Sequence, residues 1–538
     1  MVEVLMESGG QEVVVPESGG SRSSTPTEGS PKISQISADH LSLSPIQDFY
    51  SGENIFITGG TGFLGKLLIE KLLRSCPGIG FIYVLIRPKK GKDIHERAEE
   101  LLDSPLFDKL KETHPKFRHQ IVAVAGECNA PDLGISPSDR ATLIQEVSIV
   151  FHVAATLRFD EKLKLAVAVN VHGTKLMLDL AKEMPKLKSF IHVSTAYANC
   201  VEKVIGEKFY QPPIEASKLM TLVECMDDKL AEDITPRLLG KFPNTYAFTK
   251  AIAENVIHEE AGDLTVGVFR PAIVISTYRE PLRGWIDNLY GPTGVAAGAG
   301  TGLLRSLHCD GSMQANVVPG DMTVNALIVS AWDVYDRRRK GDSELPVYNY
   351  VSKDNKLTWD QLKDLTSKNG IHLPSIKAIW YYSFRNNKYK FIHLFYVYFL
   401  HLLPAFLIDA ATLCVGREPR LLKVYSKIHK FMEVLRYFST NEWAFSNDNV
   451  NSMVDKLTTR DRENFFCDIK ALSWEKFFEM YIQGIRVYLI KDPLDTLPEA
   501  REKWRKLYWI HQVTKVILAY VALRISWSVI SSLWLLVA

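Results

Sequence analysis

The chain has 538 residues, of which 46% are hydrophobic and 23% are charged, and its formal net charge is +2. This length predicts two or more domains, and this composition predicts a globular protein with a sizeable core. The balanced charge argues against a nucleic-acid-binding protein. Its seven cysteines are dispersed without metal-like spacing. The sequence therefore predicts neither a metal site nor a disulfide framework, and it favours a reducing compartment.

Residues 1–51 differ in composition from the rest of the chain. They are rich in Ser, Gly, Pro and Glu and contain no apolar run long enough for a signal peptide. Such a segment cannot bury enough surface to offset the cost of ordering it. We therefore predict a disordered tail over residues 1–51.

A glycine-rich turn follows the tail. A short apolar strand over residues 54–58 leads directly into glycines 59, 62 and 65 and then into a helical run. In this strand–turn–helix context, Gly59 permits the tight turn, Gly62 lets the backbone approach a pyrophosphate, and Gly65 allows close helix–sheet packing. The helix N-terminus attracts the anion. The turn predicts cofactor contacts from Thr58, Gly59, Gly62, Phe63, Leu64 and Gly65.

The next strand ends indicate which cofactor is bound. The strand over residues 81–86 ends in Arg87, where an NAD site usually has Asp or Glu. A guanidinium suits a 2′-phosphate, so we expect NADPH, although Arg87 also fits a solvated strand end. The strand over residues 120–125 leads to Glu127, which we expect near the adenine. The strand over residues 147–153 leads to Ala154 and Ala155, whose small side chains leave room for the cofactor.

Strands and helices alternate through the first half of the chain. This pattern predicts an α/β fold, a doubly wound parallel sheet of the Rossmann type. Asn170 opens a helix in this region, and we expect its side chain to brace the backbone. The Gly-rich stretch over residues 293–302 is predicted to be a flexible loop, because glycine disfavours a helix interior. Either a lid or an acyl passage fits this loop.

A tyrosine and a lysine four residues apart form the candidate catalytic pair. Tyr246 and Lys250 fall on a predicted helix and share one face of it. A lysine cation near the phenol is expected to depress its pKa and prepare it to protonate a reducing carbonyl. We also expect Lys250 to contact the cofactor ribose. Two hydroxyls, Ser194 and Thr195, end the preceding strand.

These residues resemble the extended short-chain dehydrogenase/reductase family. In that family a Ser or Thr at this strand end is the third catalytic residue, which implies Ser194 or Thr195, and we favour Thr195. About fifty residues separate the hydroxyls from Tyr246, more than is usual, so an inserted segment over residues 202–242 is expected beside the site.

Four motifs in order, over residues 58–65, 192–197, 246–250 and 284–292, are similar to those of fatty acyl-CoA reductases, particularly the animal, insect-like members. The resemblance covers about residues 50–500. It implies that one fatty acyl-CoA and two NADPH yield a primary fatty alcohol, two NADP and CoA, through a bound aldehyde. A membrane-bound hydroxysteroid or sugar-nucleotide dehydrogenase is the alternative enzyme, and an NADP-sensing scaffold with a dead site is the non-enzyme alternative.

The second half of the chain is predicted to be helical and membrane-associated. We expect a reductase domain over residues 52–355, a helical domain over 356–506 and a membrane segment over 507–538, where an apolar run is long enough to cross a bilayer. Residues 391–415 are apolar but have basic flanks on both sides, which favours a membrane-resting or acyl-lining segment over a span. We expect a cytosolic catalytic domain on the endoplasmic reticulum, with peroxisome and lipid droplet as alternatives. A homo-oligomer is compatible with the sequence.

Overall fold

A seven-stranded parallel sheet forms the centre of the molecule. The computed structural model describes residues 43–89 and 91–537. The strand order is β11-β7-β5-β4-β1-β2-β3, and every adjacent pair is parallel. The strands are β1 (Asn54–Thr58), β2 (Ile82–Ile86), β3 (Ile121–Ala125), β4 (Val147–His152), β5 (Ser189–Val193), β7 (Val266–Pro271) and β11 (Val347–Tyr350). The order reverses between β1 and β4, the position where such sheets bind ligands at their carboxyl edge.

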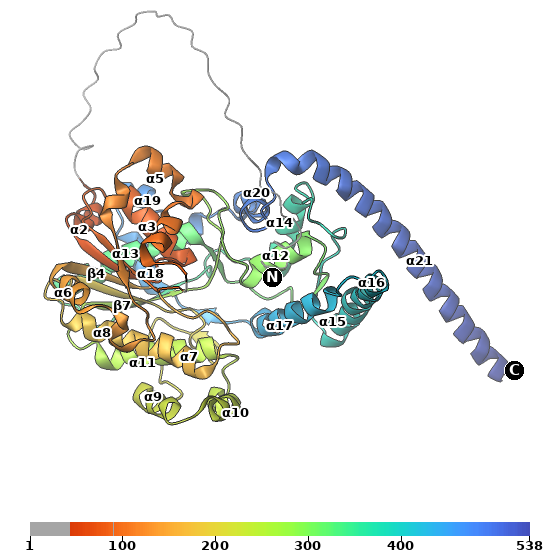
Figure 1. Cartoon of the computed structure of the whole chain (residues 1–538), viewed down its shortest axis with the longest axis horizontal. Coiled ribbons are helices and arrows are strands. Elements are labelled where there is room, and N and C mark those ends of the chain that lie inside the picture. Colours follow the sequence, from red (N-terminus) through yellow and green to blue (C-terminus); the bar gives the residue numbers. More distant parts are fainter. Residues whose placement is uncertain (1–42, 90, 538) are drawn as a thin grey trace, which may run out of the picture.

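Helices cover both faces of this sheet (Figure 1). One face carries α3 (Phe63–Ser75) and α13 (Gly320–Arg339), and the other carries α8 (Gly173–Lys182) and α11 (Thr245–Glu260). Side chains of β1 alternate between two hydrophobic cores: Ile55 and Ile57 belong to one, and Phe56 belongs to the other. The fold confirms the predicted doubly wound parallel sheet. Its connections include α4 (Ile94–Leu102), α5 (Asp108–Thr113), α6 (Pro137–Glu146), α7 (Leu163–Val167), β8 (Ile273–Ile275), β9 (Ser306–His308) and β10 (Val317–Pro319).

A short helix corrects the expected boundary of the N-terminal tail. Residues 1–42 lie outside the described part of the chain, but α2 (Pro45–Tyr50) is an ordered helix with a capping box between Ser44 and Gln47. Ile46 and Tyr50 are fully buried, and the Tyr50 hydroxyl donates to the carbonyl of Ile328 on α13 at 2.7 Å. The expectation of disorder is therefore wrong for residues 45–50, because this segment buries apolar surface against the reductase core.

The predicted flexible loop at residues 293–302 is wrong as well. The segment folds into α12 (Gly291–Gly300), with Pro292 in its first turn. Its side chains are small and mostly buried, so packing against neighbouring elements outweighs the low helix propensity of glycine. At Gly294 a Cβ would lie 2.3 Å from the carbonyl oxygen of Leu289. Glycine is thus required there for close approach to the preceding chain.

The inserted segment forms a small helical layer beside α7. It contains β6 (Val204–Ile205), α9 (Ala216–Glu224) and α10 (Asp228–Leu239), and both helices contact α7 at the lower edge of Figure 1.

The second half of the chain is mainly helical, as predicted, but it does not separate cleanly after residue 355. Strand β12 (Arg385–Asn387) pairs with β9, and β13 (Ala444–Phe445) pairs with β6 of the inserted segment. Tyr350 of β11 donates its hydroxyl to the carbonyl of Cys467 at 2.8 Å. The helices are α14 (Trp359–Gly370), α15 (Lys390–Tyr396), α16 (Leu403–Cys414), α17 (Leu421–Ser439), α18 (Asp448–Asp455), α19 (Thr459–Asn464), α20 (Trp474–Gly484) and α21 (Leu497–Val537).

Candidate active site

One cavity of about 1000 Å³ lies along the carboxyl edge of the sheet. Its walls come from the turn after β1, the ends of β2 to β5 and β7, and the first turns of α11. It continues between α12, α14 and the end of α20. The cavity thus combines the switch point of the sheet with a second, mostly apolar compartment. The predicted site residues that line it are Gly59, Gly62, Phe63, Leu64, Gly65, Arg87, Glu127, Ala154, Ala155, Ser194, Thr195, Tyr246 and Lys250.

The glycine turn is shaped to bring an anion to the start of α3. Gly59 has φ +74°, and a Cβ there would lie 2.7 Å from the backbone nitrogen of Ala154. A Cβ at Gly65 would lie 2.2 Å from the carbonyl oxygen of Gly59. Gly62 caps the helix without a side-chain hydrogen bond, so the first-turn amides face the cavity without a side-chain acceptor. This arrangement fits the pyrophosphate of a dinucleotide.

Thr58 corrects one predicted cofactor contact. Its side chain is fully buried and is not among the residues that line the cavity. The hydroxyl is 2.8 Å from Nδ1 of His152 and accepts a hydrogen bond from the Ala154 amide at 3.2 Å. Thr58 therefore ties β1 to the chain after β4 and holds the cofactor turn from behind.

Three charged side chains lie at the rim of the cofactor end. The guanidinium of Arg87 is 3.2 Å from the carboxylate of Glu127, and Arg87 is 67% exposed. Arg97, on α4, also lines the cavity and donates to the carbonyl of Arg87. Sequence reasoning missed Arg97, because its place beside Arg87 depends on how α4 folds back. Two guanidinium groups at this rim can bind a phosphate group.

The phenol of Tyr246 points to the hydroxyl after β5. Its hydroxyl hydrogen-bonds to the side chain of Thr195, and its ring packs against Phe159 with ring centroids 5.7 Å apart. Burial raises the pKa of Tyr246 above its ordinary value, and the Thr195 hydrogen bond opposes this only in part. The expected depression of this pKa by Lys250 is therefore wrong for the protein alone. Tyr246 holds its proton at neutral pH and can donate it to an oxyanion.

Lys250 is fixed at the end of β5. Its ammonium donates to the carbonyl of Val193 at 2.7 Å and lies 3.5 Å from Nε2 of His192. Burial lowers the pKa of Lys250 to about 8 and keeps the pKa of His192 well below its ordinary value, so His192 is neutral and able to accept. The lysine thus has two fixed partners and reaches the same cavity as Tyr246.

Ser194 and Thr195 have different partners, although both line the cavity. The Ser194 hydroxyl donates to the carboxylate of Glu254 at 2.5 Å. Glu254 also forms a buried, bidentate ion pair with Arg270, at 2.8 and 2.7 Å. The Ser194 proton is therefore engaged in holding the strand end, and Thr195 is the hydroxyl that meets Tyr246. This geometry favours Thr195 over Ser194 as the catalytic hydroxyl.

Sequence reasoning missed the Glu254–Arg270 pair. Arg270 donates further hydrogen bonds to the carbonyls of Gly206 and Lys208 in the inserted segment, each at 3.0 Å. Two features of the sequence could have revealed this pair. Arg270 is a charged residue within the apolar run of β7, and Glu254 follows Tyr246 by eight residues on the same helix face.

Asn170 braces the backbone, as expected. Its side-chain oxygen accepts from the amide of Thr156 at 3.0 Å, and its amide donates to Thr249 of α11 at 3.0 Å. It lies in a π-helical turn (Ala168–His172) ahead of α8. This contact holds the wall formed by residues 156–159 against α11.

Two cysteines line the cavity, Cys128 and Cys309. Burial raises the pKa of Cys128 to about 12 and raises that of Cys309 further. Neither side chain is a thiolate at neutral pH, so neither is activated to attack a thioester.

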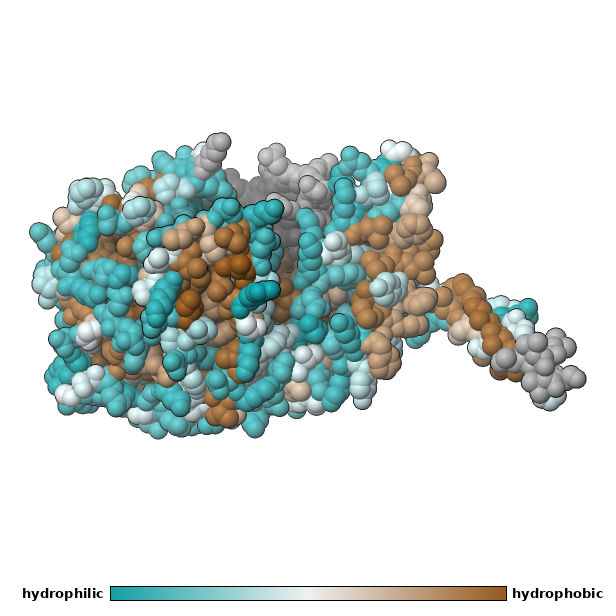
Figure 2. All heavy atoms as spheres, turned by 90° about the horizontal axis from the view of Figure 1, so that it is seen from below, coloured by the Kyte–Doolittle hydropathy of each residue, from teal (hydrophilic) through white to brown (hydrophobic). Residues whose placement is uncertain are grey.

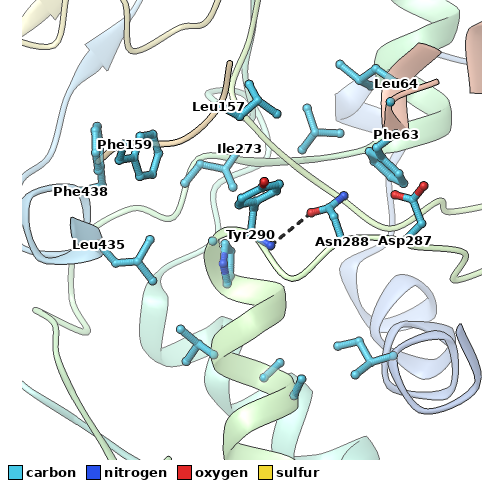
Figure 3. A pocket seen from close by; sticks show the side chains of 18 of the residues that line it. Phe63, Leu64, Leu157, Phe159, Ile273, Asp287, Asn288, Tyr290, Leu435 and Phe438 are labelled. Carbon is cyan, nitrogen blue, oxygen red and sulfur yellow. Dashed lines mark hydrogen bonds between the residues drawn. The ribbon is translucent and has the colours of Figure 1, made fainter. Parts of the chain in front are cut away.

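The cavity extends beyond Tyr246 and Lys250. Figure 3 shows Phe159, Leu435 and Phe438 on one side of Tyr290, and Phe63 and Asp287 on the other. The Tyr290 amide donates to Asn288 at 3.2 Å, and α12 starts at the next residue. The walls beyond α12 include Leu362, Ile371, Leu373, Ile482, Ile485 and Ile490. These apolar side chains suit an aliphatic ligand.

Comparisons with known proteins agree with this site. Two family models, each described as male sterility protein, match residues 57–327 and 400–492. The chain is 45% identical over 481 residues to fatty acyl-CoA reductase wat of Drosophila melanogaster, covering 89% of this chain and 92% of that protein. It is 40% identical to fatty acyl-CoA reductase 1 of Mus musculus, covering 89% of this chain and 93% of that protein.

A solved structure supports the fold alone. The reductase domain of a nonribosomal peptide synthetase from Mycobacterium tuberculosis matches with a TM-score of 0.55 at 19% identity, covering 85% of this chain and 97% of that one. The sequence matches extend over both the sheet domain and the helical second half. This chain belongs to the fatty acyl-CoA reductase family.

Proposed function

We propose that the protein reduces long-chain or very-long-chain fatty acyl-CoA to a primary fatty alcohol with two molecules of NADPH, through an aldehyde that stays bound. The observation that carries this is a single cavity containing the nucleotide turn, the Tyr246–Thr195 pair and an apolar compartment. The bound cofactor supplies one hydride to the thioester carbon and, after exchange, a second to the aldehyde carbon.

Side chains of the protein would donate the proton and stabilise the negative charge that forms on the substrate oxygen. In the first reduction, the hydroxyls of Thr195 and Tyr246 stabilise the oxyanion that forms when the thioester carbonyl accepts hydride, and the C–S bond then breaks to release CoA. In the second, Tyr246 donates its proton to the aldehyde oxygen. Lys250 holds a positive charge beside β5 and binds the cofactor ribose.

NADPH, in preference to NADH, is favoured by the two guanidinium groups at the rim. Replacing Arg87 by alanine is expected to raise the KM for NADPH about 10- to 100-fold and to leave the KM for NADH nearly unchanged, because only NADPH loses a charge-assisted hydrogen bond. Steady-state oxidation of each cofactor, with alcohol quantified, measures this. Arg118→Ala is the matched control, since Arg118 pairs with Glu99 and Asp103 and does not line the cavity. Equal losses with NADPH and NADH would contradict the proposal.

The acyl chain is placed in the compartment along α12. This ten-residue helix is about 15 Å long, begins beside Ile273 and presents small residues, including Ala299 and Gly300, to the cavity. A Cβ added at Gly300 would have no heavy atom within 4 Å. A leucine at this position thus has room to enter the compartment without displacing the fold.

Gly300→Leu is therefore expected to shift the preferred acyl-CoA to shorter chains while the rate with the shortest substrates is kept. A series of acyl-CoA lengths, each assayed for kcat/KM, measures the shift. If all chain lengths lose activity by the same factor, the compartment holds the pantetheine arm instead of the acyl chain, and this placement is wrong.

Helix α21 is proposed as a membrane anchor that leaves the catalytic domain on the cytosolic side, with the endoplasmic reticulum as the favoured membrane. Within Leu494–Ser532, most of which belongs to α21, an apolar stretch of 18 residues has no buried residue. A span needs about 20 apolar residues. Because the fatty alcohol product is insoluble in water, an anchor would keep the enzyme at a membrane that can take the product up. We expect the protein to stay in the pellet of reticulum membranes after carbonate washing and to be degraded by added protease. Release into the supernatant would contradict anchoring.

A further inference from the structure

The segment from α15 to α16 has its polar side chains inside and its apolar side chains outside. The inward positions are spaced four residues apart, at His393, Val397, His401, Ala405 and Asp409, and all of them are buried. Between them the exposed side chains are aromatic or aliphatic. These are Phe391, Leu394, Phe395, Tyr398, Phe399, Leu403, Phe406, Leu407, Ile408, Leu413 and Val415. This is the reverse of a helix that packs on a water-soluble protein.

Each inward polar group has a specific partner in the fold. Nδ1 of His393 is 2.7 Å from the Ser306 hydroxyl, and Nε2 of His401 accepts from the amide of Arg305 at 3.0 Å. The Asp409 carboxylate accepts from three backbone amides at the start of α17, at 2.9 to 3.1 Å. These contacts fix which face is outward, so the apolar surface is not available to the domain's own core.

The outward face carries no charge. Asp409 is the only Asp, Glu, Lys or Arg between residues 391 and 415, and it is buried. Phe391 is 71% exposed and Val415 is 72% exposed. Soluble monomers rarely expose an apolar patch of this extent. Figure 2 shows apolar atoms gathered at the end of the molecule that also carries α21.

Both ends of the segment return to the same domain. Before α15, β12 pairs with β9, and after α16, the Tyr425 hydroxyl of α17 donates to the carbonyl of Leu303 at 2.9 Å. A helix that crossed the bilayer would separate its two ends by the full membrane thickness. Exposed basic residues flank the apolar face on both sides, with Lys390 at the first position of α15 and Arg417 and Lys423 after α16. Such residues attract the anionic headgroups of one leaflet.

We propose that the outward face of α15 and α16 is embedded in one leaflet of the membrane, as a second attachment beside α21 that enters but does not cross the bilayer. The partner is lipid: the apolar side chains contact acyl chains, and the flanking basic residues contact headgroups. Two observations favour lipid over a protein partner. The face is uncharged, and it lies at the same end of the molecule as α21, a second exposed apolar helix. This placement does not depend on the chemistry of the cavity.

Two exposed cysteines provide a matched test within the natural chain. Cys414 ends α16, Cys225 follows α9 in the inserted segment, and the other five cysteines are buried. The full-length enzyme is placed in vesicles of phosphatidylcholine and phosphatidylserine and treated with a membrane-impermeant maleimide. Labelling is measured in intact vesicles, after pore formation with alamethicin, and after detergent. Cys225→Ser and Cys414→Ser assign the two sites, and Phe399→Cys on a Cys414→Ser background reports the middle of the face.

The expected result is that Cys225 reacts in all three conditions. Cys414 and the thiol introduced by Phe399→Cys are expected to react only after detergent, at least tenfold faster than before. Reaction in intact vesicles at the rate of Cys225 would show that the face lies in water. Reaction after alamethicin alone would show a crossing helix. Protection that persists in detergent would show cover by protein. Each of these three results would overturn the proposal.

Discussion

Replacing Tyr246 by phenylalanine is expected to lower kcat for fatty acyl-CoA about 10²–10⁴-fold, the usual contribution of a positioned proton donor. The phenol is the protonated group that meets Thr195, and burial keeps it protonated by raising its pKa. Phenylalanine keeps the packing against Phe159 and removes only the hydroxyl. The measurement is NADPH oxidation together with quantified fatty alcohol, and NADPH binding, followed by nucleotide fluorescence, should be retained.

Tyr197→Phe is the matched control for this loss. Tyr197 lines the same cavity, but its ring packs edge-on against Phe438, Trp443 and Phe445, and its position depends on these contacts. The control should keep most of the wild-type rate. If Tyr246→Phe also kept it, the proton would come from another group, and the assignment of the catalytic pair would have to be abandoned.

The features that sequence patterns predicted well are those that depend on local geometry. The turn at Gly59 and Gly65 is set by steric contacts within a few residues, and Tyr246 and Lys250 share a helix face because of the helical repeat alone. The alternation of strands and helices was likewise enough to predict the parallel sheet. Each of these inferences needed no knowledge of distant parts of the chain.

The errors came from contacts between distant segments. Helix α12 forms in spite of its glycines because its small side chains are buried against neighbouring elements, and propensity is a weak guide where packing dominates. Helix α2 had a local signal, the Ser44–Gln47 capping box, but the surface that orders it is supplied by α13, nearly three hundred residues later. The polar composition of residues 1–51 as a whole hid this short helix from a prediction based on composition.

The prediction that Lys250 lowers the pKa of Tyr246 was wrong in direction, for a related reason. Spacing on the helix placed Lys250 near Tyr246, but the sequence could not show that the Lys250 ammonium is held by the Val193 carbonyl or that the phenol is desolvated. Desolvation and hydrogen bonding depend on the whole cavity. The apolar compartment was equally hidden, because α12, α14 and the end of α20 meet only in the folded chain.

Glu254→Ala is expected to destabilise the protein by about 3–5 kcal/mol, because it leaves the Arg270 guanidinium buried without its bidentate partner. The same carboxylate holds the Ser194 hydroxyl and the Asn199 amide, at 2.5 and 3.2 Å. Its loss also frees the end of β5 that presents Thr195. Thermal unfolding of the detergent-solubilised enzyme should show a midpoint lower by roughly 5 °C or more.

Glu232→Ala on α10 is the matched control, because it removes an exposed carboxylate, whereas Glu254→Ala removes a buried one. Glu232 pairs with Lys162 at 2.7 Å, but both side chains are more than half exposed, and such pairs contribute about 0–1 kcal/mol. The two substitutions remove the same atoms and differ in burial. If Glu254→Ala unfolded at the same temperature as Glu232→Ala, the Glu254–Arg270 pair would not be what joins the catalytic helix, the end of β5 and the inserted segment. If it unfolds well below, the stability of the site depends on this charge pair, whose carboxylate shares a face of α11 with Tyr246 and Lys250 and whose guanidinium comes from β7.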